Sequence, residues 1–343
     1  MPDLVVSTPE GLFCPAGGFH VDPWGSSARA IVTHVHADHA RPGSAAYLCT
    51  EASAPFLRRR LGEGPVVQGA AYGERIRLGD AVVSLHPAGH VLGSAQIRIE
   101  AAGRVWVVSG DYKRAPDPTC TPFEPVRADV FVTEATFALP IYRWPEPDVV
   151  AAEVMAWWER NRQAGAASLL FCYAMGKAQR LLAELGRLTD RPVLVHGAVA
   201  EMSELYRRQG VWLPATTRVA ELPARRSYAG ELVLAPLSAG GTPWVRRFGE
   251  RETALASGWM RVRGTRRRKG YDRGFVLSDH ADWPGLLAAI GATGASRVGV
   301  THGYTAPLAR YLREERGLET WTLATRFTGE AGAEETAEEA LPA

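Results

Sequence analysis

The chain has 343 residues, more than one ordinary domain needs, so we expect two compact units or one unit with a large insertion. Hydrophobic residues make up 46% and charged residues 22%, an ordinary globular mixture that can bury a sizeable core. The formal net charge of +2 does not by itself indicate a partner that is a polyanion.

Membrane, secretory and disulfide signals are missing from the sequence. It has no run of about 18 apolar residues, so we expect no membrane span. The N-terminus lacks a basic segment followed by an apolar one, so we expect no signal peptide. The cysteines are scattered and form no CxxC pair, which argues against a cysteine zinc site or a disulfide framework: Cys14, Cys49, Cys120 and Cys172. We therefore expect a cytoplasmic protein with reduced thiols.

Short β-type runs alternate with helical patterns along the whole chain. In the first half we predict strands at 28–34, 81–90, 104–111 and 129–136, and helices at 53–61 and 148–163. In the second half we predict helices at 176–188 and 199–210, and strands at 168–175, 191–198, 231–238, 251–259, 274–281 and 296–304. This alternation predicts an α/β protein.

The segment THVHADH follows the first predicted strand and holds four side chains that can bind metal: His34, His36, Asp38 and His39. His34 and His36 are two positions apart, which places them on one side of an extended segment. Imidazoles and a carboxylate suit a divalent ion such as Zn²⁺. Four such groups are more than one ion would use, so the pattern favours two ions over one. A cluster of hydrogen-bonding histidines without metal is the less favoured alternative.

Other candidate ligands also follow predicted strands. They are His90, Asp111 and His302. Strand ends meet at one edge of a layered α/β fold, so we expect these side chains to converge there with the THVHADH segment. We interpret His86 as supporting or structural, and His20 and His196 as structural.

These motifs resemble those of the metallo-β-lactamase fold hydrolases, in the family's order: THVHADH, PAGHVLGS and SGDY. Three more segments resemble motifs A, B and C of the β-CASP nucleases within that fold: VFVTEATF with Glu134, FVLSDHADW with His280, and VGVTHGY with His302. LAPLSAGGTPW, ALASGWM and the segment around RRRKGYDRGF are most similar to the bacterial ligase-associated DNA exonucleases. The resemblance covers roughly residues 10–325.

The resemblance implies a metallo-β-lactamase αββα sandwich with an inserted β-CASP cap domain. We expect the first part of the sandwich domain at 1–146, the β-CASP domain at 147–268 and the second part of the sandwich domain at 269–326. The acidic remainder, 327–343, is expected to be a disordered tail.

The resemblance also implies roles for the motif residues. One metal takes His34, His36 and His90, the other takes Asp38, His39 and His302, and Asp111 bridges them. Zn²⁺ is the expected ion, with Mn²⁺ as the alternative. Asp38 also orients the attacking hydroxide. His280, held by Glu134, gives a proton to the leaving oxygen, and Asp22 orders the histidine loop.

Several segments are candidates for nucleic-acid contact. Residues 261–273 carry seven basic side chains against one acidic side chain, and Arg266, Arg267, Arg268 and Lys269 are expected to bind phosphates. Lys177, one of three lysines, follows a predicted strand and a glycine. Ser257 and Gly258 could offer backbone N–H groups to a phosphate, and Trp259 a stacking ring, although a core tryptophan is an equal alternative.

The resemblance favours a two-metal DNA exonuclease that acts 5′→3′ on single-stranded or frayed ends in DNA repair, together with an ATP-dependent DNA ligase and a helicase. A β-CASP ribonuclease or RNA 3′-end processing enzyme is the alternative, since His302 matches the RNA-cleaving members. A small-molecule hydrolase of this fold and a binding scaffold with a degenerate site are less favoured. Asp282, just after motif B, is expected to disfavour a 5′-phosphate.

Overall fold

The computed structural model describes residues 3–323 except 224, 263 and 265–269. The chain divides into two compact units. Unit 1 combines residues 1–141 with residues 280–343, and unit 2 is the continuous segment 142–279. The expected tail at 327–343 lies outside the described residues. The domain boundaries drawn from the sequence, 146/147 and 268/269, stay predictions beside this geometric division.

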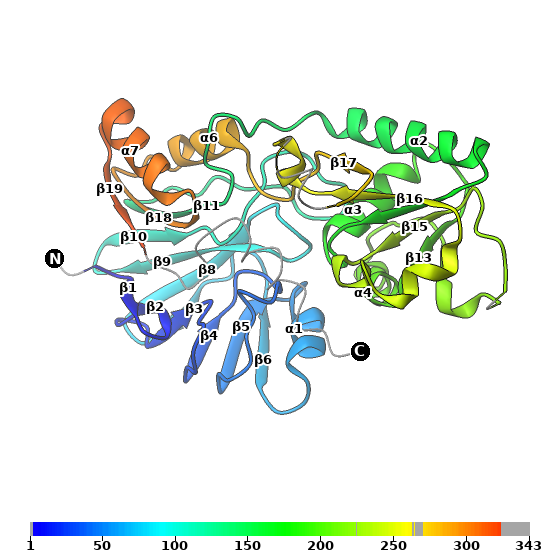
Figure 1. The fold of residues 1–343 in the computed structure, drawn as a ribbon. Coiled ribbons are helices and arrows are strands. Elements are labelled where there is room, and N and C mark those ends of the chain that lie inside the picture. Colours follow the sequence, from blue (N-terminus) through cyan, green and yellow to red (C-terminus); the bar gives the residue numbers. More distant parts are fainter. Residues whose placement is uncertain (1–2, 224, 263, 265–269, 324–343) are drawn as a thin grey trace. The chain divides into compact units, whose positions relative to one another are not determined.

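Unit 1 contains two sheets and three helices among its described residues (Figure 1). The first sheet has the order β1-β2-β3-β4-β5-β6, with β1 (Val6–Thr8), β2 (Gly11–Cys14), β3 (Phe19–Val21), β4 (Arg29–Ile31), β5 (Ala46–Thr50) and β6 (Val66–Ala70). The second has the order β19-β18-β11-β10-β9-β8-β7, with β7 (Ile76–Leu78), β8 (Ala81–Pro87), β9 (Ala95–Ala101), β10 (Arg104–Val108), β11 (Val130–Ala135), β18 (Arg297–Gly303) and β19 (Glu319–Thr322). The helices are α1 (Ala54–Leu61), α6 (Trp283–Thr293) and α7 (Thr305–Arg316).

Alternation along the strands gives unit 1 two cores. In β11, Val130 and Val132 belong to a cluster that also contains Phe19, Ile31 and other side chains of the first sheet. Phe131, between them in sequence, belongs to a second cluster with side chains of α6 and α7. Successive strand residues point to opposite faces, so one face of the second sheet packs on the first sheet and the other on the helices (Figure 1).

Unit 2 is built on one parallel sheet. The strand order is β14-β13-β15-β12-β16-β17, and each recorded pair is parallel. The strands are β12 (Ala167–Phe171), β13 (Val193–Val195), β14 (Thr216–Arg218), β15 (Leu232–Ala235), β16 (Arg251–Ala256) and β17 (Arg273–Phe275). The helices are α2 (Pro147–Gln163), α3 (Lys177–Leu185) and α4 (Gly197–Arg208), with short 3₁₀ turns η1 (Val219–Glu221), η2 (Leu237–Ala239), η3 (Pro243–Phe248) and η4 (Gly258–Arg261).

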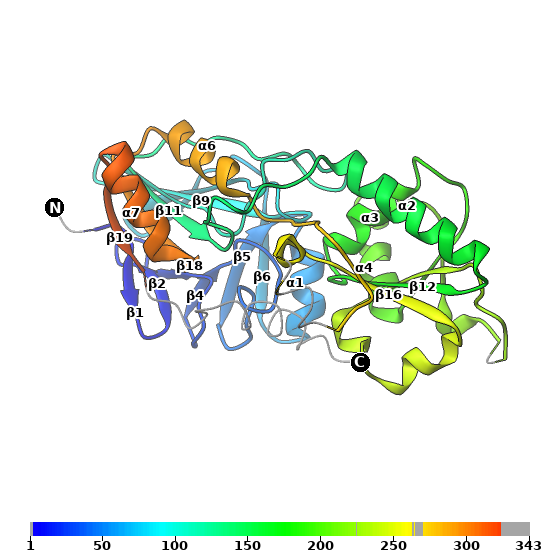
Figure 2. The ribbon, with the colours of Figure 1, turned by 45° about the horizontal axis from the view of Figure 1, so that its top comes forward.

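The helices α2 and α4 both contact α3, and both also pack against strands of this sheet (Figure 2). The strands β12 and β15 are buried at every position. This burial is typical of strands in a parallel sheet that is covered on both faces, and it explains their continuous apolar sequences. The carboxyl ends of all these parallel strands therefore lie at one edge of unit 2.

The predicted α/β class is confirmed by this mixture of strands and helices. The strand predicted at 274–281 is wrong in length, because β17 ends at Phe275 and the residues up to His280 form a buried loop. Among the described residues, no helix has the length and apolar character that crossing a bilayer requires.

Candidate metal centre

Five strand ends bring the predicted ligands to one edge of unit 1. The strands β10, β11 and β18 run parallel, so Asp111, Glu134 and His302 come at the same end of the sheet. β8 is antiparallel to β9, which is antiparallel to β10, so the loop with His90 starts at that end too. The Ala95 N–H, at the start of β9, donates to the Thr33 carbonyl at 2.8 Å and ties the loop after β4 to this edge.

Gly110 lets the end of β10 approach this loop closely. Its φ is +55°, and a Cβ placed there would lie 2.6 Å from the Cβ of Thr33. An L side chain would therefore meet both backbone strain and a direct overlap. The next residue is Asp111, so the glycine is what places the carboxylate among the histidines.

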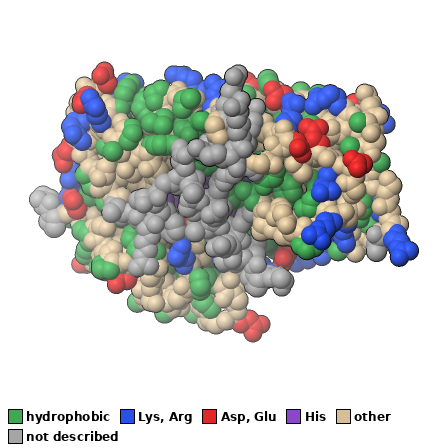
Figure 3. Space-filling view, viewed as in Figure 1, with side chains coloured by type: hydrophobic (Ala, Val, Ile, Leu, Met, Phe, Trp, Pro, Cys, Tyr) green, Lys and Arg blue, Asp and Glu red, His purple; other side chains and the backbone are tan. Residues whose placement is uncertain are grey.

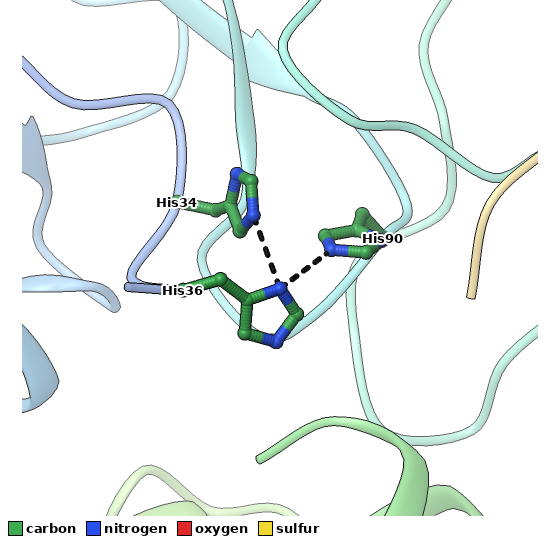
Figure 4. Close-up of side chains that lie close together, drawn as sticks. All are labelled: His34, His36 and His90. Atoms are coloured by element: carbon green, nitrogen blue, oxygen red, sulfur yellow. Dashed lines mark hydrogen bonds between the residues drawn. The ribbon is translucent and has the colours of Figure 1, made fainter. Parts of the chain in front are cut away.

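The first group of nitrogen atoms belongs to His34, His36 and His90 (Figure 4). The Nδ1 atom of His36 lies 3.1 Å from the Nε2 atom of His34 and 3.1 Å from the Nε2 atom of His90. Nitrogen ligands 2.0–2.1 Å from a tetrahedral Zn²⁺ are roughly 3.3 Å apart, close to this spacing. These residues fit one divalent ion.

His39 and Asp111 form a second group with His34. The Nε2 atom of His39 lies 3.5 Å from an Asp111 oxygen and 3.6 Å from an Asp38 oxygen. The Nδ1 atom of His39 lies 2.7 Å from an oxygen of Asp22 and can donate its proton there. Because the carboxylate of Asp22 accepts this hydrogen bond, the Nε2 atom is turned toward Asp38 and Asp111, as in carboxylate–histidine–metal arrangements.

Two observations test whether a second ion fits here. The Nε2 atom of His39 and the Oδ1 atom of Asp38 are buried and make no hydrogen bond within the described structure. Both residues line a small cavity of about 30 Å³, together with Asp22 and His302. A buried nitrogen and a buried carboxylate oxygen that lack hydrogen bonds are costly unless something binds them, and a cation suits both.

His302 reaches this cavity from a bulge. In the pairing of β11 with β18, Glu134 faces Thr301 and Ala135 faces Gly303, so His302 is the extra residue. Its φ is +53°, and Asp22, which also lines the cavity, has a φ of +42°. Strained residues of this kind gather at functional sites. The His302 ring stacks on the His39 ring, with 5.3 Å between the centroids. Among the described residues, however, Asp38, His39 and His302 do not form a group whose ligand atoms all lie within 4.8 Å of one another.

Burial and neighbouring charges divide the protonation states of this site. Burial, with His39 and His90 nearby, holds the pKa of His34 well below its usual value. Burial also acts to lower the pKa of His39, but the carboxylates of Asp111, Asp38 and Asp22 hold it well above its usual value. Burial acts to raise the pKa of Asp111, yet His39 and His280 hold it well below. The site therefore keeps an anionic carboxylate beside His39, and a metal ion at that histidine would displace a proton.

His280 and Glu134 form a hydrogen-bonded pair beside these groups. The Nδ1 atom of His280 lies 2.9 Å and 3.1 Å from the two Glu134 oxygens. The Glu134 side chain is 1% exposed, and one of its oxygens accepts from the Tyr112 N–H at 2.9 Å. Nδ1 of His280 thus donates to a fixed carboxylate, which leaves Nε2 for another partner. His280 also joins a third possible metal group with His90 and Asp111.

The segment Tyr112–Lys113 links the surrounding loops, and our sequence predictions missed it. The Ala281 N–H donates to the Tyr112 carbonyl at 2.6 Å, and the Lys113 N–H donates to the Ala88 carbonyl at 3.1 Å. The Lys113 ammonium is buried in an ion pair with Asp117. This segment therefore sets the positions of the loops that carry His280 and His90. A lysine two residues after Asp111 was the one available signal in the sequence.

The three other histidines discussed above have local partners instead. His86 lies between Ser84 and Glu124, and His20 between Thr8 and Ser27. His196 accepts from the Ala198 N–H at the start of α4.

Comparison with known proteins finds several that are similar to this chain in sequence. The chain is 32% identical over 319 residues to a probable DNA ligase of Opitutus terrae, covering 91% of this chain and 30% of that protein. It is 25% identical over 150 residues to an RNase J-like protein of Methanocaldococcus jannaschii, covering 41% and 36%. It is 30% identical over 120 residues to cleavage and polyadenylation specificity factor subunit 3 of Dictyostelium discoideum, covering 34% and 15%.

These relatives support the assignment of the chain to the β-CASP family. The chain spans 36% or less of the length of each of the three. No family model matches it. A crystal structure of a protein of unknown function from Enterococcus faecalis is similar, with a TM-score of 0.58 and 12% identity, covering 87% of this chain and 79% of that one. That likeness shows the fold alone.

The predicted nucleic-acid contacts fall in the segment that forms unit 2. Arg266, Arg267, Arg268 and Lys269 lie outside the described residues. The Ser257 Oγ accepts from the Trp259 N–H at 3.3 Å, and Gly258 begins η4. Trp259 is 5% exposed with its ring edge-on to Tyr142, so it offers little area for stacking on a base. Lys177 begins α3 and is also buried.

On the face drawn in Figure 3, the described Lys and Arg side chains occur in separate places with Asp and Glu between them. That face carries no single described patch of basic side chains. These contact roles therefore stay predictions.

Proposed function

We propose that the chain is a two-metal DNA exonuclease that hydrolyses phosphodiester bonds. The observation that carries the proposal is the meeting, at one edge of unit 1, of histidine and aspartate groups that could hold metal with the His280–Glu134 pair. An ion-binding set beside a histidine backed by a buried carboxylate suits phosphoryl transfer from a diester.

Each residue has a defined part in this mechanism. His34, His36 and His90 would hold one ion, Asp38, His39 and His302 the other, and Asp111 would bridge them. Bound Zn²⁺ or Mn²⁺ would supply Lewis acidity for attack of water on phosphorus.

The surrounding side chains would direct that chemistry. Asp38 orients the attacking water, and Asp22 keeps the His39 ring turned toward the ions through the 2.7 Å hydrogen bond. His280 gives a proton from Nε2 to the leaving oxygen, while Glu134 holds its Nδ1–H. An architecture of the αββα type with an inserted β-CASP domain, divided as the sequence predicts, completes the proposal.

DNA is the proposed substrate because the match to a probable DNA ligase covers 91% of this chain, whereas matches to the relatives named as RNA-processing proteins cover less than half. We infer action 5′→3′ on single-stranded or frayed ends, in cytoplasmic DNA repair, with an ATP-dependent DNA ligase and a helicase as partners. A ribonuclease is the second candidate, since one relative is named RNase J-like.

The test is digestion of end-labelled DNA and RNA strands side by side, with Zn²⁺, with Mn²⁺ and with chelator. We expect cleavage of DNA that needs metal and begins at the 5′ end. His36→Ala should lose bound metal and activity together. His280→Ala should keep its metal while kcat falls by about 10²- to 10⁴-fold, as loss of a general acid requires.

Three outcomes would contradict this proposal. Preferred cleavage of RNA would favour the second candidate. Full activity in chelator would exclude metal dependence. Loss of metal from His280→Ala would make His280 a ligand rather than the proton donor.

A further inference from the structure

The loop between β12 and α3, at the carboxyl edge of the sheet in unit 2, is held tightly from within. The Gly176 N–H donates to the Gln179 Oε1 at 2.8 Å, and the Gln179 amide donates to the Ala174 carbonyl at 2.9 Å. The Ala178 N–H donates to the Tyr173 carbonyl at 3.1 Å. Gly176 has a φ of +89° and ends the loop directly before the first residue of the helix. The N-terminus of α3 is thus a fixed structure.

Lys177, the first residue of α3, is 4% exposed, and its ammonium lies 4.4 Å from the centroid of the Tyr173 ring. Tyr173 precedes the helix, and side chains in a helix lean toward its N-terminus, so the ammonium lies at that end. The ring contact is the one interaction of this ammonium within the described structure. No acidic residue stands in the first turn of α3.

Two other buried cations are paired differently. Lys113 has an ion pair with Asp117, and Arg180 on α3 itself lies 2.8 Å from Glu184 and 3.6 Å from Asp279. Each of these cations faces a carboxylate, as buried charges do as a rule. Lys177 departs from that rule among the described residues. Its position at a helix N-terminus is also unfavourable for a cation, because the helix dipole is positive there.

A buried ammonium at a positive helix end is stabilised by an anion. We propose that Lys177 and the first turn of α3 form a phosphate subsite, which holds a phosphodiester of the nucleic-acid strand. This inference rests on the proposed function, since the phosphodiester belongs to the nucleic-acid strand that the nuclease would bind. The long flexible stem of lysine lets the ammonium turn from the Tyr173 ring to a phosphate without movement of the helix.

The test compares Lys177→Met with Lys177→Arg and with a control, Arg208→Met. Methionine keeps an unbranched apolar stem and removes the charge, while arginine keeps the charge. Arg208, 70% exposed on α4 of the same unit, pairs only at the surface with Glu204 in the described structure. Binding is measured with a short fluorescent DNA strand that has nuclease-resistant phosphorothioate linkages, over a range of salt concentrations.

We expect Lys177→Met to weaken strand binding several-fold and to reduce the slope of log K against log salt by about 0.7, the value for one phosphate contact on a single strand. Lys177→Arg and Arg208→Met should bind nearly as the wild type does. Inorganic phosphate should raise the melting temperature of the wild-type chain more than that of Lys177→Met. Without phosphate, Lys177→Met should melt at or above the wild-type temperature, because the uncompensated charge is gone.

Three results would overturn the subsite. One is strand binding by Lys177→Met with an unchanged salt slope. Another is a lower melting temperature for Lys177→Met in the absence of phosphate, which would assign Lys177 to packing on Tyr173. The third is equal stabilisation of wild type and Lys177→Met by phosphate. Failure of the proposed function is distinguishable, since a wild-type chain that binds the strand through Lys177 but cleaves neither DNA nor RNA would keep the subsite and refute the nuclease.

Discussion

The carboxylate of Asp111 lies among the histidines because the residue before it has no side chain. Gly110 combines a φ of +55° with a position where a Cβ would overlap Thr33. We expect Gly110→Ala to lower the free energy of unfolding by roughly 2–5 kcal/mol, the sum of the left-handed backbone cost and the overpacking cost. Urea denaturation monitored by circular dichroism measures this change.

Gly103 supplies a matched control for that substitution. Its φ is +72°, but no atom lies within 4 Å of an added Cβ. Gly103→Ala should therefore cost only the backbone term, about 1–2 kcal/mol. Equal losses for the two substitutions would show that the loop after β4 yields to an added methyl group, and that Gly110 is not needed for the position of Asp111.

Individual ligand candidates could be predicted from the sequence because each stands in a short motif after a strand. The contacts that orient these ligand candidates were harder to predict from the sequence. The bond of Asp22 to His39 joins residues 17 apart, and only the family resemblance indicated a role for Asp22. The link from Lys113 to Ala88 joins backbone atoms, so no side chain reveals it. The burial of Trp259 and Lys177 also depends on packing between elements distant in sequence, which no local pattern encodes.

At the scale of elements, α6 begins with a cap that the sequence predictions did not include. The Asp282 carboxylate accepts from the Gly285 N–H at 2.9 Å, and a proline follows in the first turn. This hydrogen bond turns one carboxylate oxygen of Asp282 toward the helix. The prediction that Asp282 repels a 5′-phosphate therefore depends on the other oxygen. We expect Asp282→Ala to lower the free energy of unfolding by about 0.5–2 kcal/mol.

Serine at the same position separates capping from charge. Asp282→Ser keeps an oxygen that can accept from the helix and should lose much less stability than Asp282→Ala. Thermal unfolding of both variants in metal-free buffer gives the comparison. If both lose the same stability, the negative charge at the helix N-terminus matters more than the cap.

The long helix α2 was predicted close to its bounds, whereas helices α6 and α7 and several short strands were not predicted. The helix expected at 148–163 is α2, Pro147–Gln163. Strands β1, β3 and β7 have three residues each, too few to display an alternating pattern. Helix α6 is apolar on nearly every side, so its 3.6-residue period is weak, and only the aspartate–proline start and Gly294 signalled it.

At the scale of the whole molecule, the chain divides into two compact units, which should respond differently to metal. The candidate ligands all lie in unit 1, on the loops after β4, β8 and β10 and at the bulge near the end of β18. An ion that binds only the folded site stabilises it by about 4 kcal/mol at a thousand times its Kd. We therefore expect two calorimetric transitions, of which chelator lowers only one.

His36→Ala is the control for this experiment. Its metal-sensitive transition should stay at the position that chelator produces in the wild type, while the other transition is unchanged. A single transition, or two that shift together with metal, would show that the units unfold as one cooperative body.

The insertion of unit 2 also has a consequence for synthesis on the ribosome. Unit 2 is continuous and can fold once residue 279 has emerged, whereas β18, which pairs with β11 in the middle of the second sheet of unit 1, is made later. Pairing of Val130 with Arg297 must wait for everything between them, which is a costly long-range closure. The nascent chain therefore carries the THVHADH ligands and His90 before His280 and His302 have been made. An N-terminal fragment that ends before β18 would leave one edge of β11 unpaired, and an unpaired edge of this kind promotes aggregation.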